Sequence, residues 1–225
     1  MDHLYIAGCS EQHNVAPLDS DVRRHIAALR LRDGEQVKVL NGRGLIAHCT
    51  VERTPGTVSL VIRDRVLVPK PRGLTLVMSI LDGRDRFEFS LEKATELGIT
   101  RFVPLLAEKS QHHRTSEVRL QAKAIAAITQ CGVAWLPEIA PPTTIDVLPW
   151  GTRVIVGDDK GKPPSSEDIA DDLCVIVGPE GDFSEREKNV LRADPRTRHW
   201  AIGPNRLRAE TAAMSLIANV VSGRS

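Results

Sequence analysis

The chain has 225 residues, of which 41% are hydrophobic and 26% are charged, and its formal net charge is +1. This composition is typical of a globular protein, and the length suits one large domain or two small ones. A net charge near zero gives no overall signal for nucleic acid binding.

No segment approaches the roughly 18 consecutive apolar residues that a membrane helix requires, and the first residues do not have the pattern of a signal peptide. The four cysteines lie far apart and form no C-x-x-C pair, which argues against a zinc site and a disulfide framework. We therefore expect a cytoplasmic protein with no bound metal and no membrane partner.

The first part of the chain has mostly β character. Residues 4–7 form a candidate strand, and Asp19 with Ser20 is positioned to cap a short helix. Several short apolar runs follow in residues 35–68, separated by turns at "NGRG" and "TPG". Short strands closed by tight turns favour a small barrel or sandwich.

Residues 69–73, "PKPRG", interrupt this pattern, so we place a domain boundary there and expect domains at 1–70 and 73–225. Beyond the boundary, candidate strands and helices alternate, which predicts an α/β domain with a mostly parallel sheet. Ser184 and Glu187 form a capping box at the start of one of these helices. The predicted strands are 74–80, 101–106, 153–157, 173–178 and 199–203, and the predicted helices are 84–98, 116–132, one from Ser184, and a terminal one.

Three consecutive strand candidates of the second part end in a glycine and a polar loop. These glycines are Gly157, Gly178 and Gly203. A glycine after a strand is often only turn chemistry, but ligands of open parallel sheets bind outside the carboxyl ends of the strands. Neither a G-x-G-x-x-G fingerprint nor a P-loop is present. Exposed carbonyls and the Glu180 carboxylate suit a ligand with a positive centre and hydroxyl groups, and S-adenosylmethionine has both.

Three segments then resemble signature blocks of a known family. "LEKATELGI" (91–99), "VGPEGDFSEREKNVL" (177–191) and "LRAETAAMSLIANV" (207–220) are similar to the ribosomal RNA small subunit methyltransferase E family of the SPOUT superfamily. The resemblance covers nearly the whole chain. It implies an RNA-binding, PUA-like β-barrel at 1–70 and a SPOUT methyltransferase domain with a trefoil knot at 73–225.

The same resemblance implies a homodimer that binds S-adenosylmethionine and methylates N3 of a uridine in small-subunit ribosomal RNA, either free or in the assembled subunit. It implies cofactor contacts from the three glycine-led loops. The residues carried over are Gly157, Gly178, Pro179, Glu180, Gly181, Ile202, Gly203, Pro204, Leu207, Arg208, Ala209 and Thr211.

The chain departs from the family pattern at three positions. Asp182 stands where a glycine is usual, Val133 where an arginine is common, and Arg206 where an aliphatic residue is usual. An added charge at 182 would either assist binding of the sulfonium or distort the loop. These departures leave open a non-catalytic RNA-binding homologue and a methyltransferase with another RNA target. A nucleotide-binding oxidoreductase is a further alternative, which the missing dinucleotide fingerprint disfavours.

For catalysis we expect Arg208 to steady the uracil anion, with Glu210 orienting Arg208 or receiving the imide proton. The alternative is a simple charge pair at the start of the helix. Thr211 suits either a backbone contact at the helix start or a cofactor contact. His112 and His113 lie in a polar loop, and we expect them to face solvent rather than to act in catalysis.

Basic residues of the first domain are candidates for RNA contact, although such a cluster is more commonly a solvated face. The candidates lie on or just after the first helix and are Arg23, Arg24, Arg30 and Arg32. In the terminal helix, apolar residues recur at helical spacing and predict a face for the core or the dimer interface. They are Ala209, Ala212, Ala213, Leu216, Ile217 and Val220.

Overall fold

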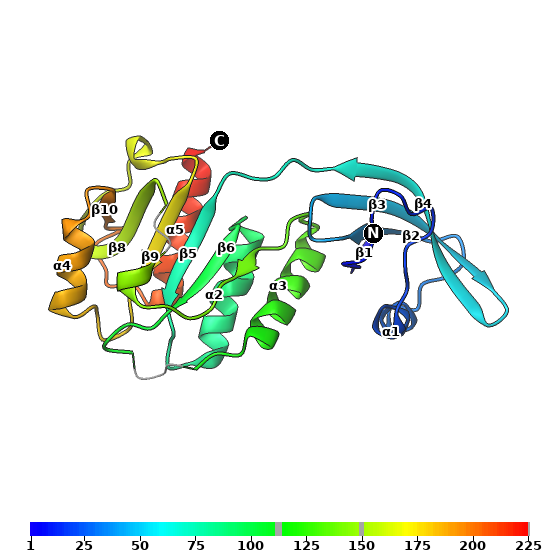
Figure 1. The fold of residues 1–225 in the computed structure, drawn as a ribbon, viewed down its shortest axis with the longest axis horizontal. Coiled ribbons are helices and arrows are strands. Elements are labelled where there is room, and N and C mark those ends of the chain that lie inside the picture. Colours follow the sequence, from blue (N-terminus) through cyan, green and yellow to red (C-terminus); the bar gives the residue numbers. More distant parts are fainter. Residues whose placement is uncertain (111–113, 149–150, 225) are drawn as a thin grey trace. The chain divides into compact units, whose positions relative to one another are not determined.

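The structure is a computed structural model that describes residues 1–110, 114–148 and 151–224, and its chain divides into two compact units (Figure 1). Residues 1–71 and 125–136 make up the first unit, and the second comprises 72–124 and the residues from 137 onward. The main junction falls within the Pro- and Gly-rich segment. Segment 125–136, which the sequence pattern places in the second domain, groups with the first unit.

A four-stranded sheet forms the first unit, in the order β1-β2-β3-β4. The strands are β1 (Asp2–Tyr5), β2 (Gln36–Leu40), β3 (Leu45–Thr54) and β4 (Thr57–Leu67). β1 pairs in parallel with β2, and the other two pairings are antiparallel. The segment around Val15 adds a bridge to β4. The expected strands joined by tight turns are thus present, although β3 and β4, with 10 and 11 residues, are longer than expected.

Helix α1 (Ser20–Ala28) completes this unit. The Asp19 side chain accepts hydrogen bonds from the backbone N–H groups of Asp21 and Val22, so the predicted cap is confirmed. Ile26 is fully buried against the sheet, while the other residues of the helix are mostly exposed. The unit's core is built from apolar residues of all four strands, among them Leu4, Val37, Val39, Leu45, Ala47, Val51 and Leu60.

The second unit has a six-stranded sheet in the order β10-β8-β9-β5-β6-β7, and all of its pairings are parallel. The expected α/β fold with a parallel sheet is confirmed. The strands are β5 (Leu74–Ser79), β6 (Arg101–Leu105), β7 (Glu138–Ile139), β8 (Arg153–Lys162), β9 (Leu173–Val177) and β10 (Thr197–Trp200). Its helices are α2 (Arg84–Glu96), α4 (Glu185–Ala193) and α5 (Ala209–Gly223), with short 3-10 turns η1 (Ile145–Val147) and η2 (Ser166–Asp168). Helix α3 (Glu117–Cys131) begins in this unit, and its residues from Ile125 onward group with the first unit.

Both faces of the sheet are covered, and every residue of the central strand β9 is buried. Ile176 of β9 packs in one core cluster with Leu191 of α4, while α5 contacts β8 and β9. Because side chains alternate along a strand, α4 and α5 cover opposite faces. The predicted capping box at Ser184 is present in α4. The apolar face of α5 is buried within the chain, except that Ala212 is only half-buried.

Strand β8 does not end at Gly157, as the glycine pattern predicts, but leaves its partner and returns. Val156 is paired with His199 of β10, and the next pair is Lys162 with Trp200. Residues 157–161 therefore form a bulge between two paired segments. Gly161 is required there, because a Cβ atom would lie 2.5 Å from the backbone oxygen of His199.

Candidate functional site

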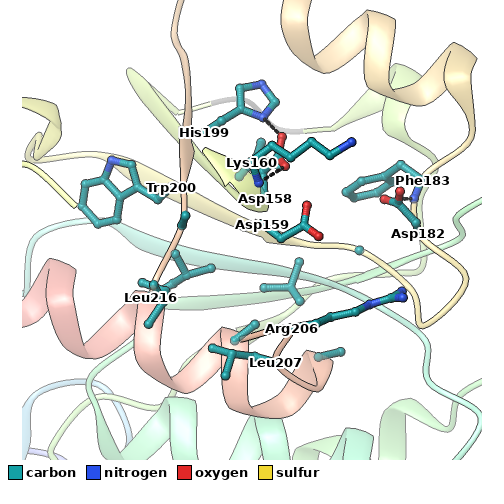
Figure 2. Close-up of a pocket in the computed structure, with 18 of the residues that line it drawn as sticks. Asp158, Asp159, Lys160, Asp182, Phe183, His199, Trp200, Arg206, Leu207 and Leu216 are labelled. Carbon is teal, nitrogen blue, oxygen red and sulfur yellow. Dashed lines mark hydrogen bonds and ion pairs between the residues drawn. The ribbon is translucent and has the colours of Figure 1, made fainter. Parts of the chain in front are cut away.

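A pocket of about 700 Å³ opens at the carboxyl ends of β8, β9 and β10, which are neighbours in the sheet (Figure 2). Three chain segments line most of it: 156–160 at the bulge of β8, 177–183 after β9, and 199–216, from the end of β10 into α5. The expectation that three glycine-led loops come together is confirmed. Leu207 and Leu216 lie across the pocket from His199 and Asp158 (Figure 2).

Ten of the twelve residues expected to contact the cofactor line this pocket. Pro204 and Thr211 do not, and both are exposed. Thr211 lies in the first turn of α5 but outside the pocket wall. The role of the other ten toward a cofactor stays a prediction, because what the structure establishes is their placement. They are Gly157, Gly178, Pro179, Glu180, Gly181, Ile202, Gly203, Leu207, Arg208 and Ala209.

Polar residues of the β8 bulge and β10 also line the pocket, and sequence reasoning missed them. Asp158 Oδ2 lies 3.0 Å from His199 Nδ1, and Asp158 Oδ1 accepts a hydrogen bond from the backbone N–H of Lys160. Asp159 and Trp200 complete this part of the wall. The polar run "DDK" directly after Gly157 could have indicated these residues, but the prediction used only the glycines.

Asp182, where the family usually has glycine, adopts a left-handed backbone conformation with φ +63°. Non-glycine residues seldom do so, and aspartate is among the better tolerated. Its side chain accepts a hydrogen bond from the backbone N–H of Phe183 at 2.7 Å, and Lys188 Nζ lies 2.7 Å from its other oxygen. The loop is therefore formed with the aspartate in place, and Lys188 balances its charge.

Glu210 forms an ion pair with Arg86 rather than with Arg208. Arg86 Nε and Nη2 donate to the two carboxylate oxygens of Glu210, at 3.0 Å and 2.6 Å. The hydrogen bonds from Arg86 hold the pKa of Glu210 below its usual value. No hydrogen bond or ion pair joins Glu210 to Arg208 among the described residues, so the contact by which Glu210 would orient Arg208 is not formed here. The alternative role of Glu210, as acceptor of the imide proton, stays a prediction.

Arg208 is the N-cap residue of α5, and its exposed side chain lies at the pocket. No hydrogen bond or ion pair engages its guanidinium within the described part of the chain. Arg206 reaches instead to the second loop, where its Nη2 donates to the backbone oxygen of Glu180 at 3.0 Å. The two basic residues of this loop thus differ: Arg206 bridges two pocket walls, and Arg208 is available to a ligand.

The four arginines predicted to contact RNA are all exposed in the first unit. Arg23 donates to the backbone oxygen of Val58, and Arg24 pairs with Asp21. Val133 is half-buried and its N–H bonds the backbone oxygen of Ile128. His112 and His113 lie outside the described residues.

The described residues contain neither a metal-binding cluster nor a membrane-spanning helix. Across residues 1–110, 114–148 and 151–224, no group of three or more His, Cys, Asp or Glu side chains is placed to hold a metal ion. Within those ranges, no helix is both long and apolar enough to cross a membrane.

Two family models match the chain. The model described as an RNA methyltransferase domain matches residues 68–221, and the model described as an RNA methyltransferase PUA domain matches residues 18–63. The first covers more than half of the chain and includes all three segments that line the pocket.

Curated relatives are similar along nearly their whole length. The ribosomal RNA small subunit methyltransferase E of Rickettsia conorii is 28% identical, over 97% of this chain and 94% of the relative. Its counterpart in Aquifex aeolicus is also 28% identical, over 87% and 89% of the two chains. The chain is thus similar to whole relatives and not to a shared fragment alone.

Solved structures are similar over the same extent. The ribosomal RNA small subunit methyltransferase E of Neisseria gonorrhoeae, bound to S-adenosylmethionine, aligns with a TM-score of 0.86 and 25% identity, over 99% of this chain and 97% of that one. A Legionella pneumophila protein, described as a methyltransferase in complex with the same cofactor, aligns with a TM-score of 0.83 and 25% identity, over 98% and 96%.

Proposed function

Because the chain belongs to the RNA methyltransferase family, we propose that it transfers a methyl group from S-adenosylmethionine to N3 of a uridine in small-subunit ribosomal RNA. The observation that carries this proposal is the pocket at the ends of β8, β9 and β10, which lies wholly within the matched family domain. The names of the relatives supply the ribosomal RNA target.

The pocket's residues fit the proposed cofactor. Backbone groups of Ile202, Gly203 and Leu207 make no hydrogen bond to other described residues, so they are available to the polar edge of a base. Carboxylates at Asp158 and Asp159 suit a positive centre and ribose hydroxyls. The bound cofactor would supply a methyl group on a sulfonium, which makes that methyl electrophilic.

Methyl transfer of this kind depends mainly on holding the nucleophile in line, and the uracil imide must also lose a proton. We assign Arg208 the role of stabilising the negative charge that then develops on the base oxygens. Its guanidinium is exposed at the pocket and forms no hydrogen bond or ion pair with another described residue, which supports that role. Arg208→Ala should lower the rate of methylation at saturating cofactor about a hundredfold or more. Arg84→Ala, at an exposed arginine outside the pocket's lining, serves as the matched control.

The first unit would bind the RNA. The exposed quartet at positions 23, 24, 30 and 32 supports phosphate contact. Phosphate contacts release counterions, so affinity for ribosomal RNA should fall steeply with added salt, and replacing the quartet with alanine should flatten that slope by up to about 0.9 per lost contact. An unchanged slope would mean that these arginines serve only as a solvated surface.

We also propose that the protein is a homodimer and that it acts in the cytoplasm. We further propose that the chain of the second domain forms a trefoil knot. The path of the chain supports the knot. After the edge strand β10, the chain turns back to place α5 against β8, β9 and α2. Sedimentation of the purified protein, over a range of concentrations, tests the dimer.

One assay tests the proposed reaction. Small subunits and free ribosomal RNA from cells that lack the modification are incubated with the protein and the cofactor, and the product is mapped by mass spectrometry. A single methylated uridine, with the methyl group on N3, is the expected product. Methylation at another nucleotide would revise the target, and calorimetry that detects no cofactor binding would favour a non-catalytic RNA-binding protein.

A further inference from the structure

Arg86 lies in the first turn of α2, on an element that contributes no residue to the pocket's lining. Its guanidinium nevertheless forms ion pairs with Glu180 and Glu210, in two of the segments that line the pocket. The backbone permits this approach at Gly83, where a Cβ atom would lie 3.1 Å from Arg86 Cδ. The side chain is one-third exposed, so most of its surface is covered by the protein.

The guanidinium of Arg86 contacts two separate walls of the pocket. Nη1 donates to Glu180 Oε1 at 2.8 Å, in the loop that follows β9. Nε and Nη2 donate to both oxygens of Glu210, in the first turn of α5. Glu210 is 14% exposed and Glu180 is 42% exposed, so the contact to α5 is the better shielded of the two.

The segment before α5 also holds Glu180 in place. Arg206 donates to the backbone oxygen of Glu180, so this loop residue is held through its side chain by α2 and through its backbone by the segment before α5. A planar guanidinium that engages a carboxylate at two points fixes orientation as well as distance. The relative position of the two walls thus depends on Arg86.

We propose that Arg86 is a positioning residue for cofactor binding, which holds the 178–183 loop through Glu180 and the start of α5 through Glu210. The inference rests on the proposed function, because the pocket so shaped is the one assigned to S-adenosylmethionine. It also assigns Glu210 to the framework of the site rather than to proton transfer. Pre-forming both walls spares the cofactor the cost of ordering them.

The test compares Arg86→Gln with Arg86→Lys and with the control Arg84→Gln, in the full-length protein. Arg84 lies in the same helical turn and is 71% exposed, and its Nε lies 4.0 Å from Glu88 Oε1. Calorimetry with S-adenosylmethionine gives Kd, methylation of RNA gives kcat and KM, and circular dichroism verifies folding.

Arg86→Gln should raise the Kd for the cofactor at least tenfold, and kcat at saturating cofactor should stay within about threefold of the wild-type value. The Kd of Arg86→Lys should lie between those of the wild-type protein and Arg86→Gln, because an ammonium cannot engage Glu210 at two points. Glu180→Gln should also raise Kd.

Two results would overturn the proposal: an Arg86→Gln protein that binds cofactor as well as Arg84→Gln does, or one with unchanged Kd and a large loss of kcat. A Glu210→Gln protein that binds cofactor normally but cannot transfer methyl at any pH would also overturn it. Wild-type protein that binds no S-adenosylmethionine would instead refute the proposed function, and this outcome is seen before any variant is made.

Discussion

Replacing Asp182 by glycine and by alanine should reverse the usual order of stability for these two residues. In ordinary backbone conformations, glycine is less stable than alanine by about 0.5–1 kcal/mol, because it loses more conformational freedom on folding. At φ +63° the order changes, since a left-handed conformation costs a residue with a Cβ about 1–2 kcal/mol and costs glycine almost nothing.

Both variants remove the same two side-chain contacts, to the backbone N–H of Phe183 and to Lys188. The loss of these contacts therefore cancels when the variants are compared. Setting about 1–2 kcal/mol of strain against about 0.5–1 kcal/mol of entropy leaves a difference of roughly 0.75 kcal/mol at the midpoints of the two ranges. For a chain of this length, that difference corresponds to roughly 1–4 °C in Tm.

The assay is thermal unfolding followed by circular dichroism, at one protein concentration and one scan rate, with and without S-adenosylmethionine. The glycine variant should unfold at the higher temperature in both conditions. If the alanine variant has an equal or higher Tm, residue 182 does not hold a left-handed conformation, and the account of its departure from the family pattern fails.

Three further predictions concern the framework around the site. The exposed thiol of Cys131 should react with a thiol reagent at pH 8 in the folded protein, whereas Cys174, whose pKa burial raises to about 12, should react only on unfolding, as mass spectrometry would record. Glu88→Gln should lower Tm at pH 7, because hydrogen bonds from Arg119 lower the Glu88 pKa. A lowered pKa gives stability that is present above the ordinary value near 4.5 and is lost as the pH falls through the folded value, so the Tm difference should vanish in acid. Gly161→Ala should weaken cofactor binding in calorimetry, because its Cβ would press on the backbone of the paired strand, and unchanged affinity would show that the bulge can shift freely.

Local signals predicted much of the fold because each depends on few neighbours. The Asp19 cap, the Ser184–Glu187 box and the fully buried strand β9 each follow from a short stretch of sequence, and each is present. The convergence of the three glycine-led loops was predictable because parallel strands place their carboxyl ends at one edge.

Features that depend on distant partners were not predictable. The bulge of β8 depends on its register with β10, which periodicity within one strand does not encode. The pairing of Glu210 with Arg86 joins residues 124 positions apart, whereas the expected contact with Arg208 was the nearest charge in sequence. The grouping of residues 125–136 with the first unit likewise depends on contacts outside their own helix.

The order in which the pocket's walls appear along the chain bears on when the protein becomes active during synthesis. The first unit's sheet is complete by Leu67, but the last wall of the pocket extends to Leu216. A nascent chain that ends between Leu136 and Leu216 would contain every residue of the first unit, with the proposed RNA-binding surface, but no complete cofactor site. On the proposed function, the residues that contact RNA are therefore synthesised before those that complete the site of methyl transfer.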